Sequence, residues 1–477
     1  MWKILLAIAV AVVLVVFATT QINDKPNKPE FIEIASLELD GNAEILQTNA
    51  DGTLLVYTNS KRSSVDVVDL TDPEAPYVIA AVEVPGEPTS VDLSPDGNWA
   101  VVTLHKDKAQ TGETPPDLRL PGLLALLDLR DPASPALATI IGIANHPDSI
   151  AVSQTGDELL AVIAIENEPV YALEGLVVDD DAGGEDISAP GVVQLVRFNP
   201  ERPGNWNVTT LEFSATELNN ALMLNTDDPQ PEFVTLSPGR HMAAVSLQEN
   251  NGIVLIDLSS AEIAGAFSLG QVVERAADLV SDGEVKLSQN YPTDVQASTL
   301  AGSRFPDAIA FTPDGQYLLS ADEGEADLTG GRGFSIWSLN GELIWDDGGE
   351  VEQRAAQANL YPDERSENKG VEIEGITAGR FGSRDFAFAV SERGSFLIIY
   401  DISNPAAPQF VQLLPTGTGP ESVVAVPERN LVVVSAEESG VLTLFRYEAG
   451  DLEAAENPAA ESPPEPEPEQ EPEPEPL

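Results

Sequence analysis

Acidic side chains recur at two fixed positions of a repeating sequence unit. The first position is acidic in six of seven units, which carry Glu44, Asp148, Glu232, Asp307, Glu374 and Glu421, with Thr89 in the other. The second position lies about 16 to 18 residues further on and holds Glu166, Glu249, Glu323, Glu392 and Glu437, with Asn59 and His105 in the remaining two. Several carboxylate oxygens together are the ligands that Ca²⁺ and Mg²⁺ prefer. The pattern therefore predicts a divalent-cation site, with Ca²⁺ as the expected ion and the ten acids from Asp148 to Glu437 in these two sets as its ligands.

Basic side chains near the same segments offer another way to balance these charges. Carboxylates that lie close together raise one another's pKa unless a cation accompanies them. A salt-bridge network is therefore an alternative to a metal ion, and it would use Arg365, Lys369, Arg393 and His105. A solvated acidic rim is a third possibility. His146 comes directly before Pro147 and is either a base or ligand of the site or a structural cap of the strand. The candidate ligand-binding residues are Arg365, Lys369, Arg393 and His146.

A separate run of acids offers a second, weaker metal signal. Residues 179–186 read Asp-Asp-Asp-Ala-Gly-Gly-Glu-Asp and form a second Ca²⁺ candidate. The run lacks the spacing of an EF-hand loop, so an acidic flexible connection is the favoured interpretation.

The unit that carries the acids is a set of four short strands. Its first two strands meet at a tight turn, best seen in Ser94-Pro95-Asp96-Gly97 and Thr312-Pro313-Asp314-Gly315, where Pro and Gly favour turn geometry. Its third strand occurs seven times, at residues 65–70, 123–129, 192–198, 253–258, 334–339, 396–402 and 441–447. Short strands at this spacing are typical of radially arranged blades. The sequence predicts an all-β fold, a seven-bladed β-propeller over residues 31–448.

The last unit ends after its third strand. Residues 31–39 form an apolar-alternating segment ahead of the first unit and can supply the missing strand, so the ring is predicted to close by pairing the chain ends. Two stacked sandwiches are the alternative, and they explain neither the count of seven nor this closure.

The antiparallel first and second strands place the two acidic positions at one end of each blade. Both sets are therefore expected to crowd one mouth of the central channel. The long connections at residues 107–121, 168–190, 271–304 and 346–369 follow a second strand or join two blades, so they project from the same face. Loops that elaborate one face of a rigid scaffold usually carry function.

Both ends of the chain differ in composition from the repeats. Lys3 is followed by apolar residues from 4 to 18, which indicates an export signal over residues 1–20, either cleaved or kept as an anchor. Residues 449–477 consist largely of Glu and Pro and predict an extended, disordered acidic tail. The protein is expected outside the cytoplasm, as a secreted, periplasmic or N-terminally anchored protein that touches the membrane only through its first segment.

Composition excludes several classes of function. Against 79 Asp and Glu stand 24 Lys and Arg, giving a net charge of −55, which repels nucleic acid. The chain has no Cys, so disulfides, thiolate metal sites and Cys nucleophiles are excluded. It also lacks a Gly-x-Ser-x-Gly elbow, a His-Glu-x-x-His motif and a P-loop.

A set of motifs in the second half of the repeats is similar to those of a known family. They are Pro306-Asp307-Ala308, Ala321-Asp322-Glu323-Gly324-Glu325, Arg332-Gly333-Phe334-Ser335-Ile336-Trp337, Ser391-Glu392-Arg393-Gly394 and, most specifically, the stretch from Arg365 to Gly375. With these motifs the chain resembles the choice-of-anchor I family, which includes mesenchyme-specific cell-surface glycoproteins. The resemblance covers nearly all of residues 43–447 and implies a seven-bladed propeller at the cell surface or outside the cell. Ile373 stands where the family usually has Pro, so loop-dependent specificity does not carry over.

Two functions follow from these observations. The first is an exported binding or scaffold propeller, expected to be monomeric, whose acidic mouth holds a divalent cation and contacts an extracellular ligand or protein. The alternative is a Ca²⁺-dependent phosphoesterase, resembling the alkaline phosphatases or phytases with which family members are compared. In it, cations would offset phosphate charge and activate water, and Arg365, Lys369 and Arg393 would contact the phosphate.

Overall fold

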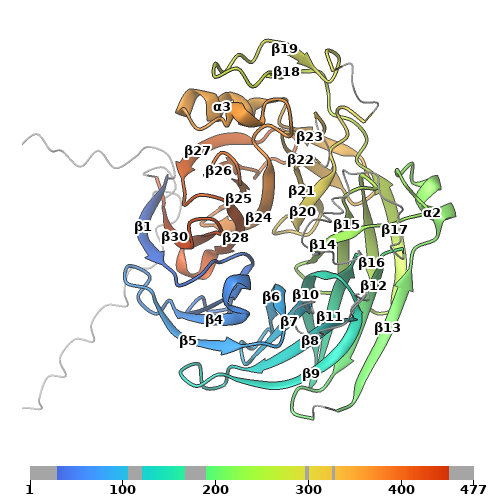
Figure 1. Cartoon of the computed structure of the whole chain (residues 1–477), viewed down its shortest axis with the longest axis vertical. Helices are drawn as coiled ribbons and strands as arrows, with labels where there is room; N and C mark the ends of the chain where they lie inside the picture. The colour runs from blue at the N-terminus through green and yellow to red at the C-terminus, as the bar shows by residue number, and fades with distance from the viewer. Residues whose placement is uncertain are drawn as a thin grey trace, which may run out of the picture. The chain divides into compact units, whose positions relative to one another are not determined.

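Seven four-stranded antiparallel sheets make up the repeats, and we number them as blades 1 to 7. The computed structural model describes residues 30–105, 121–166, 190–202, 204–295, 300–324 and 328–450. In Figure 1 the first strands of the blades surround the centre and the fourth strands lie at the periphery. The predicted all-β, seven-bladed propeller is confirmed.

Blades 1 to 3 follow the chain in order. Blade 1 holds β2 (Leu46–Thr48), β3 (Leu54–Asn59), β4 (Ser64–Asp69) and β5 (Tyr77–Glu83). Blade 2 holds β6 (Glu87–Leu93), β7 (Trp99–His105), β8 (Pro121–Asp128) and β9 (Ala136–Asn145). Blade 3 holds β10 (Pro147–Thr155), β11 (Glu158–Ile165), β12 (Val192–Phe198) and β13 (Trp206–Glu212).

Blades 4 to 6 continue the same pattern. Blade 4 holds β14 (Pro231–Leu236), β15 (Met242–Leu247), β16 (Gly252–Asp257) and β17 (Glu262–Ser268). Blade 5 holds β20 (Pro306–Phe311), β21 (Tyr317–Asp322), β22 (Gly333–Ser338) and β23 (Leu343–Asp346). Blade 6 holds β24 (Ile373–Phe381), β25 (Arg384–Ser391), β26 (Phe396–Asp401) and β27 (Gln409–Pro415).

Blade 7 is built from both ends of the repeats. It holds β28 (Pro420–Val426), β29 (Leu431–Ala436) and β30 (Val441–Glu448), and β1 (Glu30–Glu38) adds the outer strand beside β30. Phe31 of β1 is fully buried and makes edge contacts with Phe381, Phe386 and Phe388 of blade 6. The predicted closure by an N-terminal strand is confirmed, and it seals an aromatic cluster as well as a sheet edge.

The repeated turn has the predicted geometry. In the copy at Ser94, the Gly97 N–H donates to the Ser94 carbonyl over 2.8 Å, and Gly97 has a φ of 69°. The copy at Thr312 repeats this, with a 2.8 Å bond from the Gly315 N–H to the Thr312 carbonyl and the same φ of 69°. Such positive φ values favour glycine, which is why Gly ends both motifs.

The long connections contain elements that the strand pattern did not predict. Helix α2 (Ala215–Asn220) joins blades 3 and 4, and α3 (Glu350–Ala358) joins blades 5 and 6. Between blades 4 and 5, β18 (Arg275–Ala277) pairs with β19 (Gln289–Tyr291) in a separate two-stranded sheet. Short 3₁₀ turns occur at η1 (Ser60–Arg62), η4 (Asp363–Arg365) and η5 (Pro427–Arg429).

Apolar side chains from neighbouring blades pack together in the core. One cluster joins blades 5 and 6 through Ile336, Val371 and Ile398, and another joins blades 1 and 2 through Val67 and Val102. Residues 31–447 form one unit. Among the described residues, no helix is long and apolar enough to cross a membrane. The predicted signal or anchor segment and most of the predicted tail lie outside the described residues.

Candidate functional site

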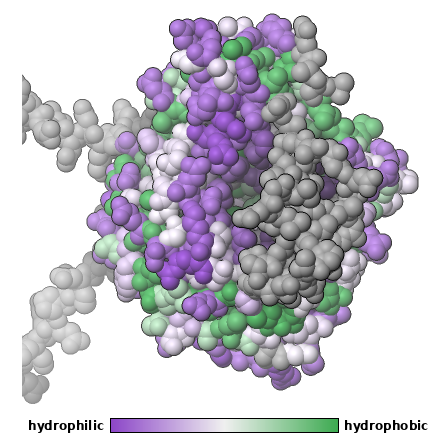
Figure 2. Space-filling model, viewed as in Figure 1, coloured by the Kyte–Doolittle hydropathy of each residue, from purple (hydrophilic) through white to green (hydrophobic). Residues whose placement is uncertain are grey.

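The first strands of the blades line a central channel, and a cavity of about 310 Å³ opens at the end where these strands begin. All six first-position acids line it, together with Thr89 of blade 2. We call this end of the channel, with the carboxylates of both recurring positions, the acidic mouth. Figure 2, viewed from the same side as Figure 1, shows a strip of hydrophilic residues across this face of the propeller.

A local irregularity at the start of six first strands accompanies the first-position acids. In β10 the pairing with β11 shifts between Pro147 and Ile150, and Asp148 lies inside the shift. The same shift encloses Glu232 in β14 and Asp307 in β20, and it recurs in β6, β24 and β28. A β-bulge redirects a side chain relative to the pleat of the strand. The bulge therefore places a polar side chain at the channel wall in each of these six blades, an acid in five of them and Thr89 in β6.

The second-position residues lie at the same end of the blades, as the antiparallel pairing requires. Pro147 at the start of β10 pairs with Ile165 at the end of β11, and the Glu166 N–H donates to the His146 carbonyl over 3.0 Å. The Glu392 N–H donates in the same way to the Glu372 carbonyl over 3.0 Å in blade 6. Glu166, Glu323 and Glu392 are buried, whereas Glu249 and Glu437 are half-buried.

Two groups of three carboxylates are close enough to share one ion. In the first group, from blades 3 and 4, ligand atoms of Asp148, Glu166 and Glu232 all lie within 4.8 Å of one another. In the second, from blades 6 and 7, the same holds for Glu374, Glu392 and Glu421. We call these the blade 3–4 triad and the blade 6–7 triad. Asp307, Glu323, Glu249 and Glu437 belong to neither.

Burial and mutual repulsion raise the pKa of the acids at the mouth. Burial first, and then the charges of Glu437 and Glu44, raise the pKa of Glu421 to about 9. Burial raises the pKa of Glu44 to about 7, against the effect of a hydrogen bond from Ser60. Burial, followed by neighbouring carboxylates, places the pKa of three more first-position acids well above the usual range: Glu232, Asp307 and Glu374. The mouth therefore holds protons or needs cations near neutral pH.

Imidazole rings accompany the blade 3–4 triad. His146 Nδ1 lies 2.6 Å from Glu166 Oε2, and the His146 ring lies 4.1 Å, centroid to centroid, from that of His105. Burial, followed by the nearby charge of His146, lowers the pKa of His105 to about 3. His105 is therefore neutral at physiological pH. The contact with Glu166 places the His146 side chain beside the blade 3–4 triad, directly before the start of β10.

Longer basic side chains meet the acids of blades 5 and 6. Lys369 Nζ lies 2.9 Å from Glu323 Oε1. Arg393 Nε lies 2.8 Å from Glu392 Oε2 and 3.4 Å from Glu372 Oε2. Arg365 Nε lies 2.5 Å from Glu372 Oε1. Three of the four bases of the salt-bridge alternative therefore pair with acids on this side of the mouth, whereas His105 lies against His146.

Three residues of the mouth were missed by the sequence reasoning. The Gln248 side chain donates to Glu323 Oε2 over 2.7 Å, and the Asn42 side chain donates to both Glu44 and Glu437, over 2.8 and 2.9 Å. Glu372 accepts from Arg365 and Arg393. Gln248 and Glu372 lie next to or two residues from a recurring acid, so their sequence position was the available signal. The candidate run at residues 179–186 lies outside the described residues, as do nearly all of the connections at 107–121 and 168–190.

Comparison with known families supports the resemblance drawn from the motifs. The model of the choice-of-anchor I domain matches residues 44–327 and 326–405. The chain belongs to the choice-of-anchor I family. The match includes both carboxylates of blades 3 to 5 and the acids Glu374 and Glu392 of blade 6, so the mouth lies largely within the family domain. No curated protein matches the chain.

Solved structures share the fold of this choice-of-anchor I protein at low sequence identity. Kuenenia stuttgartiensis hydrazine synthase is 15% identical, with a TM-score of 0.52, over 87% of this chain and 98% of that chain. The RRP9 WD40 repeats are 9% identical, with a TM-score of 0.54, over 88% of this chain and 100% of that chain. The β-propeller domain of Myceliophteria thermophila Cps50 (Swd1) is 11% identical, with a TM-score of 0.50, over 87% and 99%. At these identities the likeness shows the fold alone.

Proposed function

We propose that this choice-of-anchor I protein is an exported binding propeller that holds a divalent cation, Ca²⁺ first among them, at its acidic mouth. The observation that carries the proposal is the pair of carboxylate triads, each with ligand atoms within 4.8 Å, around one channel cavity. Ca²⁺ takes six to eight oxygen ligands in flexible geometry, so three carboxylates supply part of a shell that water or a bound partner completes.

Of the two triads, the blade 3–4 triad is the better candidate for the cation site. The charges that act most strongly on Glu232 are the carboxylates of Asp148, Glu166, Glu249 and Asp307. In the blade 6–7 triad, the nearest strong charge on Glu392 is the guanidinium of Arg393. The blade 3–4 triad also has a basic neighbour, since His146 lies 2.6 Å from Glu166, but an imidazole can release its proton whereas a guanidinium stays charged. The blade 3–4 triad therefore keeps more of its negative charge for a cation.

The family and the fold support an exported location and binding at the acidic mouth. Proteins with choice-of-anchor domains are typically exported or located at the cell surface. In this proposal an extracellular ligand or protein would bind at the face of the acidic mouth, which the loop of Lys369 borders through its contact with Glu323. The phosphoesterase alternative needs Arg365, Lys369 and Arg393 to contact phosphate. Each of them pairs with a carboxylate instead, so these contacts do not favour it.

Thermal unfolding of the purified full chain, first stripped with a chelator, tests the proposal. Ca²⁺ that binds only the folded state stabilises it by RT ln(1 + [L]/Kd), about 2.7 kcal/mol at a hundredfold excess over Kd. Na⁺ at matched ionic strength is the control, since screening alone relieves repulsion between exposed charges. Equal shifts with Ca²⁺ and Na⁺ would contradict the proposal. A phosphoester hydrolysis screen on the same samples separates the binding protein from the phosphoesterase.

A further inference from the structure

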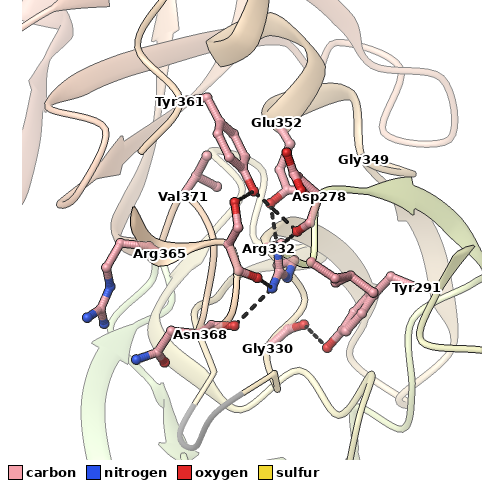
Figure 3. A network of polar contacts seen from close by, with 12 residues as sticks. Asp278, Tyr291, Gly330, Arg332, Gly349, Glu352, Tyr361, Arg365, Asn368 and Val371 are labelled. Atoms are coloured by element: carbon pink, nitrogen blue, oxygen red, sulfur yellow. Dashed lines mark hydrogen bonds and ion pairs between the residues drawn. The ribbon is translucent and has the colours of Figure 1, made fainter. Parts of the chain in front are cut away.

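The loop that carries Lys369 is tied to a buried arginine rather than left at the surface. Arg332 is fully buried, and its guanidinium donates to the carbonyls of Ser366 and Asn368, each over 2.9 Å. It also donates to the Asp278 carbonyl over 3.1 Å and pairs with Glu352 of α3 at 3.2 Å. One side chain thus joins the blade 4–5 connection, α3 and the loop at residues 365–370 (Figure 3).

Further contacts fix the same loop on both sides of Lys369. The Tyr361 hydroxyl lies 3.2 Å from Ser366 Oγ, and the Asn368 and Gly370 N–H groups donate to the Arg365 carbonyl over 2.9 and 3.0 Å. Gly370 has a φ of 68°, and a Cβ there would lie 2.4 Å from Glu352 Oε1. The backbone can pass this close to the Arg332–Glu352 pair only without a side chain.

Lys369 therefore leaves a backbone that is anchored at the residues before and after it. Its ammonium reaches Glu323 Oε1 at 2.9 Å, while Gln248 occupies Glu323 Oε2 at 2.7 Å. Lys369 is also one of the charges that act on Asp307, a first-position acid of the channel wall. An ammonium held at this point cancels one negative charge of the mouth without an external ion.

We propose that Lys369 is a built-in counter-ion of the acidic mouth and that Arg332 is the positioning residue that holds it there. This inference rests on the proposed cation binding. The positive charge of Lys369 opposes the entry of a divalent cation and so lowers the affinity of the mouth for it. Arginine is needed at position 332 because its fork of donors reaches two carbonyls and a carboxylate together, whereas a lysine presents a single ammonium. The same pair of residues would thus set how tightly the mouth holds its ion.

Titration calorimetry with CaCl₂ on the full chain tests this directly. Lys369→Gln should bind Ca²⁺ about tenfold more tightly than the parent, since one positive charge leaves the mouth. Lys369→Arg keeps the charge and should bind like the parent. Lys286→Gln is the matched control, because Lys286 pairs with the exposed Asp282 and Glu284 of a connection and its loss changes the net charge equally. Where the parent binds Ca²⁺, equal tightening in Lys369→Gln and Lys286→Gln, or none in either, would overturn the counter-ion role.

The role of Arg332 is tested by combining variants. Arg332→Lys should tighten Ca²⁺ binding in the parent but add nothing in the Lys369→Gln background, since the ammonium that it releases is already gone. A structural effect of Arg332 alone would weaken or leave binding unchanged, or would act equally in both backgrounds, and either result overturns the positioning role. Should Arg332→Lys fail to fold, Gly370→Ala displaces the same loop from the Arg332–Glu352 pair and takes its place.

A metal-free arm separates this inference from the proposed function. In chelator, Lys369→Gln should lower the melting temperature and gain more from added NaCl than Lys286→Gln, because repulsion in the mouth has increased. If neither the parent nor any variant binds Ca²⁺, the cation-binding function is wrong, and this arm alone decides the counter-ion role. If the parent binds Ca²⁺ and the two Gln variants respond identically to NaCl, the counter-ion role is wrong and the binding function stands.

Discussion

The two sides of the acidic mouth balance the same kind of charge in different ways. On blades 3 and 4, Asp148, Glu166 and Glu232 gather beside an imidazole, that of His146. On blades 5 and 6, Glu323 and Glu392 meet the long cations Lys369 and Arg393. Both sides use acids at the same two positions of the repeat, so the difference comes from the basic residues beside them.

The basic residues, unlike the acids, do not recur from blade to blade. Acids at the start and end of paired strands recur because the strands recur, whereas Lys369 belongs to a single connection between blades 5 and 6. The guanidinium of Arg332 is fully buried beneath that connection. The repeated scaffold thus provides carboxylates in most blades, and basic residues that are not repeated, Lys369 among them, make the charge around the mouth uneven. The side of the mouth at blades 3 and 4 is thereby left for an external cation to bind.

Removing the closing strand should destroy both sides at once, because they share one ring. Deletion of residues 31–39 exposes the edge of β30 and removes Phe31 from its aromatic cluster. We expect loss of the cooperative unfolding transition of the whole propeller, measured by circular dichroism during heating. A truncated protein that melts like the parent would show that blade 7 does not need β1.

Removing the buried Arg332 should destabilise the protein more than a change to His146 on the other side of the mouth. Arg332→Met leaves the fully buried Glu352 without its cation and should cost about 3–5 kcal/mol in urea unfolding. On the other side, His146→Asn keeps a donor near Glu166 and tolerates the φ of 50° at this position, so it should cost about 1 kcal/mol or less. Similar losses of stability for both variants would contradict the contrast between a fully buried guanidinium and a half-buried imidazole.

Neutralising each triad in turn tests which side holds the ion. Asp148→Asn with Glu232→Gln should abolish most of the Ca²⁺ stabilisation, about 2.7 kcal/mol at a hundredfold excess over Kd. Glu374→Gln with Glu421→Gln, which removes two carboxyls from the other triad, is the matched pair and should retain more of it. The measurement is the Ca²⁺-dependent change in melting temperature against matched NaCl. A larger loss of Ca²⁺ stabilisation in the second pair of variants would place the ion at the blade 6–7 triad instead.

Raising the pH should lower the folding stability of the metal-free protein. The pKa of Glu421 is raised to about 9 in the folded state from 4.5, so the folded state is favoured fully below pH 4.5 and this contribution is lost as the pH rises to 9. Glu44, with a pKa of about 7, acts in the same direction. Melting temperatures in chelator should fall from pH 5 to 9, and Ca²⁺ should reduce the fall. The melting temperature of Glu421→Gln should fall less steeply with pH. A fall as steep as that of the parent would contradict the assignment of this pH dependence to Glu421.

The sequence predicted the architecture because each blade is specified locally. The Ser94 and Thr312 turns, the strand alternation and the segment at residues 31–39 are all short-range signals, and their structures match. The position of the acids at one mouth also followed, since antiparallel pairing places Asp148 and Glu166 at the same end. By contrast, α3 and the β18–β19 sheet lie inside connections, where no repeat supports a prediction.

The amino-acid sequence by itself determined the number of blades, the closing strand and the two rings of carboxylates, because these depend on strand period, turn residues and pairing direction. Only the tertiary structure decided which carboxylates come within 4.8 Å of one another, and which acid each base meets. Those outcomes depend on bulges that redirect side chains and on contacts between segments far apart in the chain, such as that of Arg332 with Glu352 and Asn368. Burial then raises the pKa of the carboxyls, an effect that depends on the surrounding fold and not on the residue type.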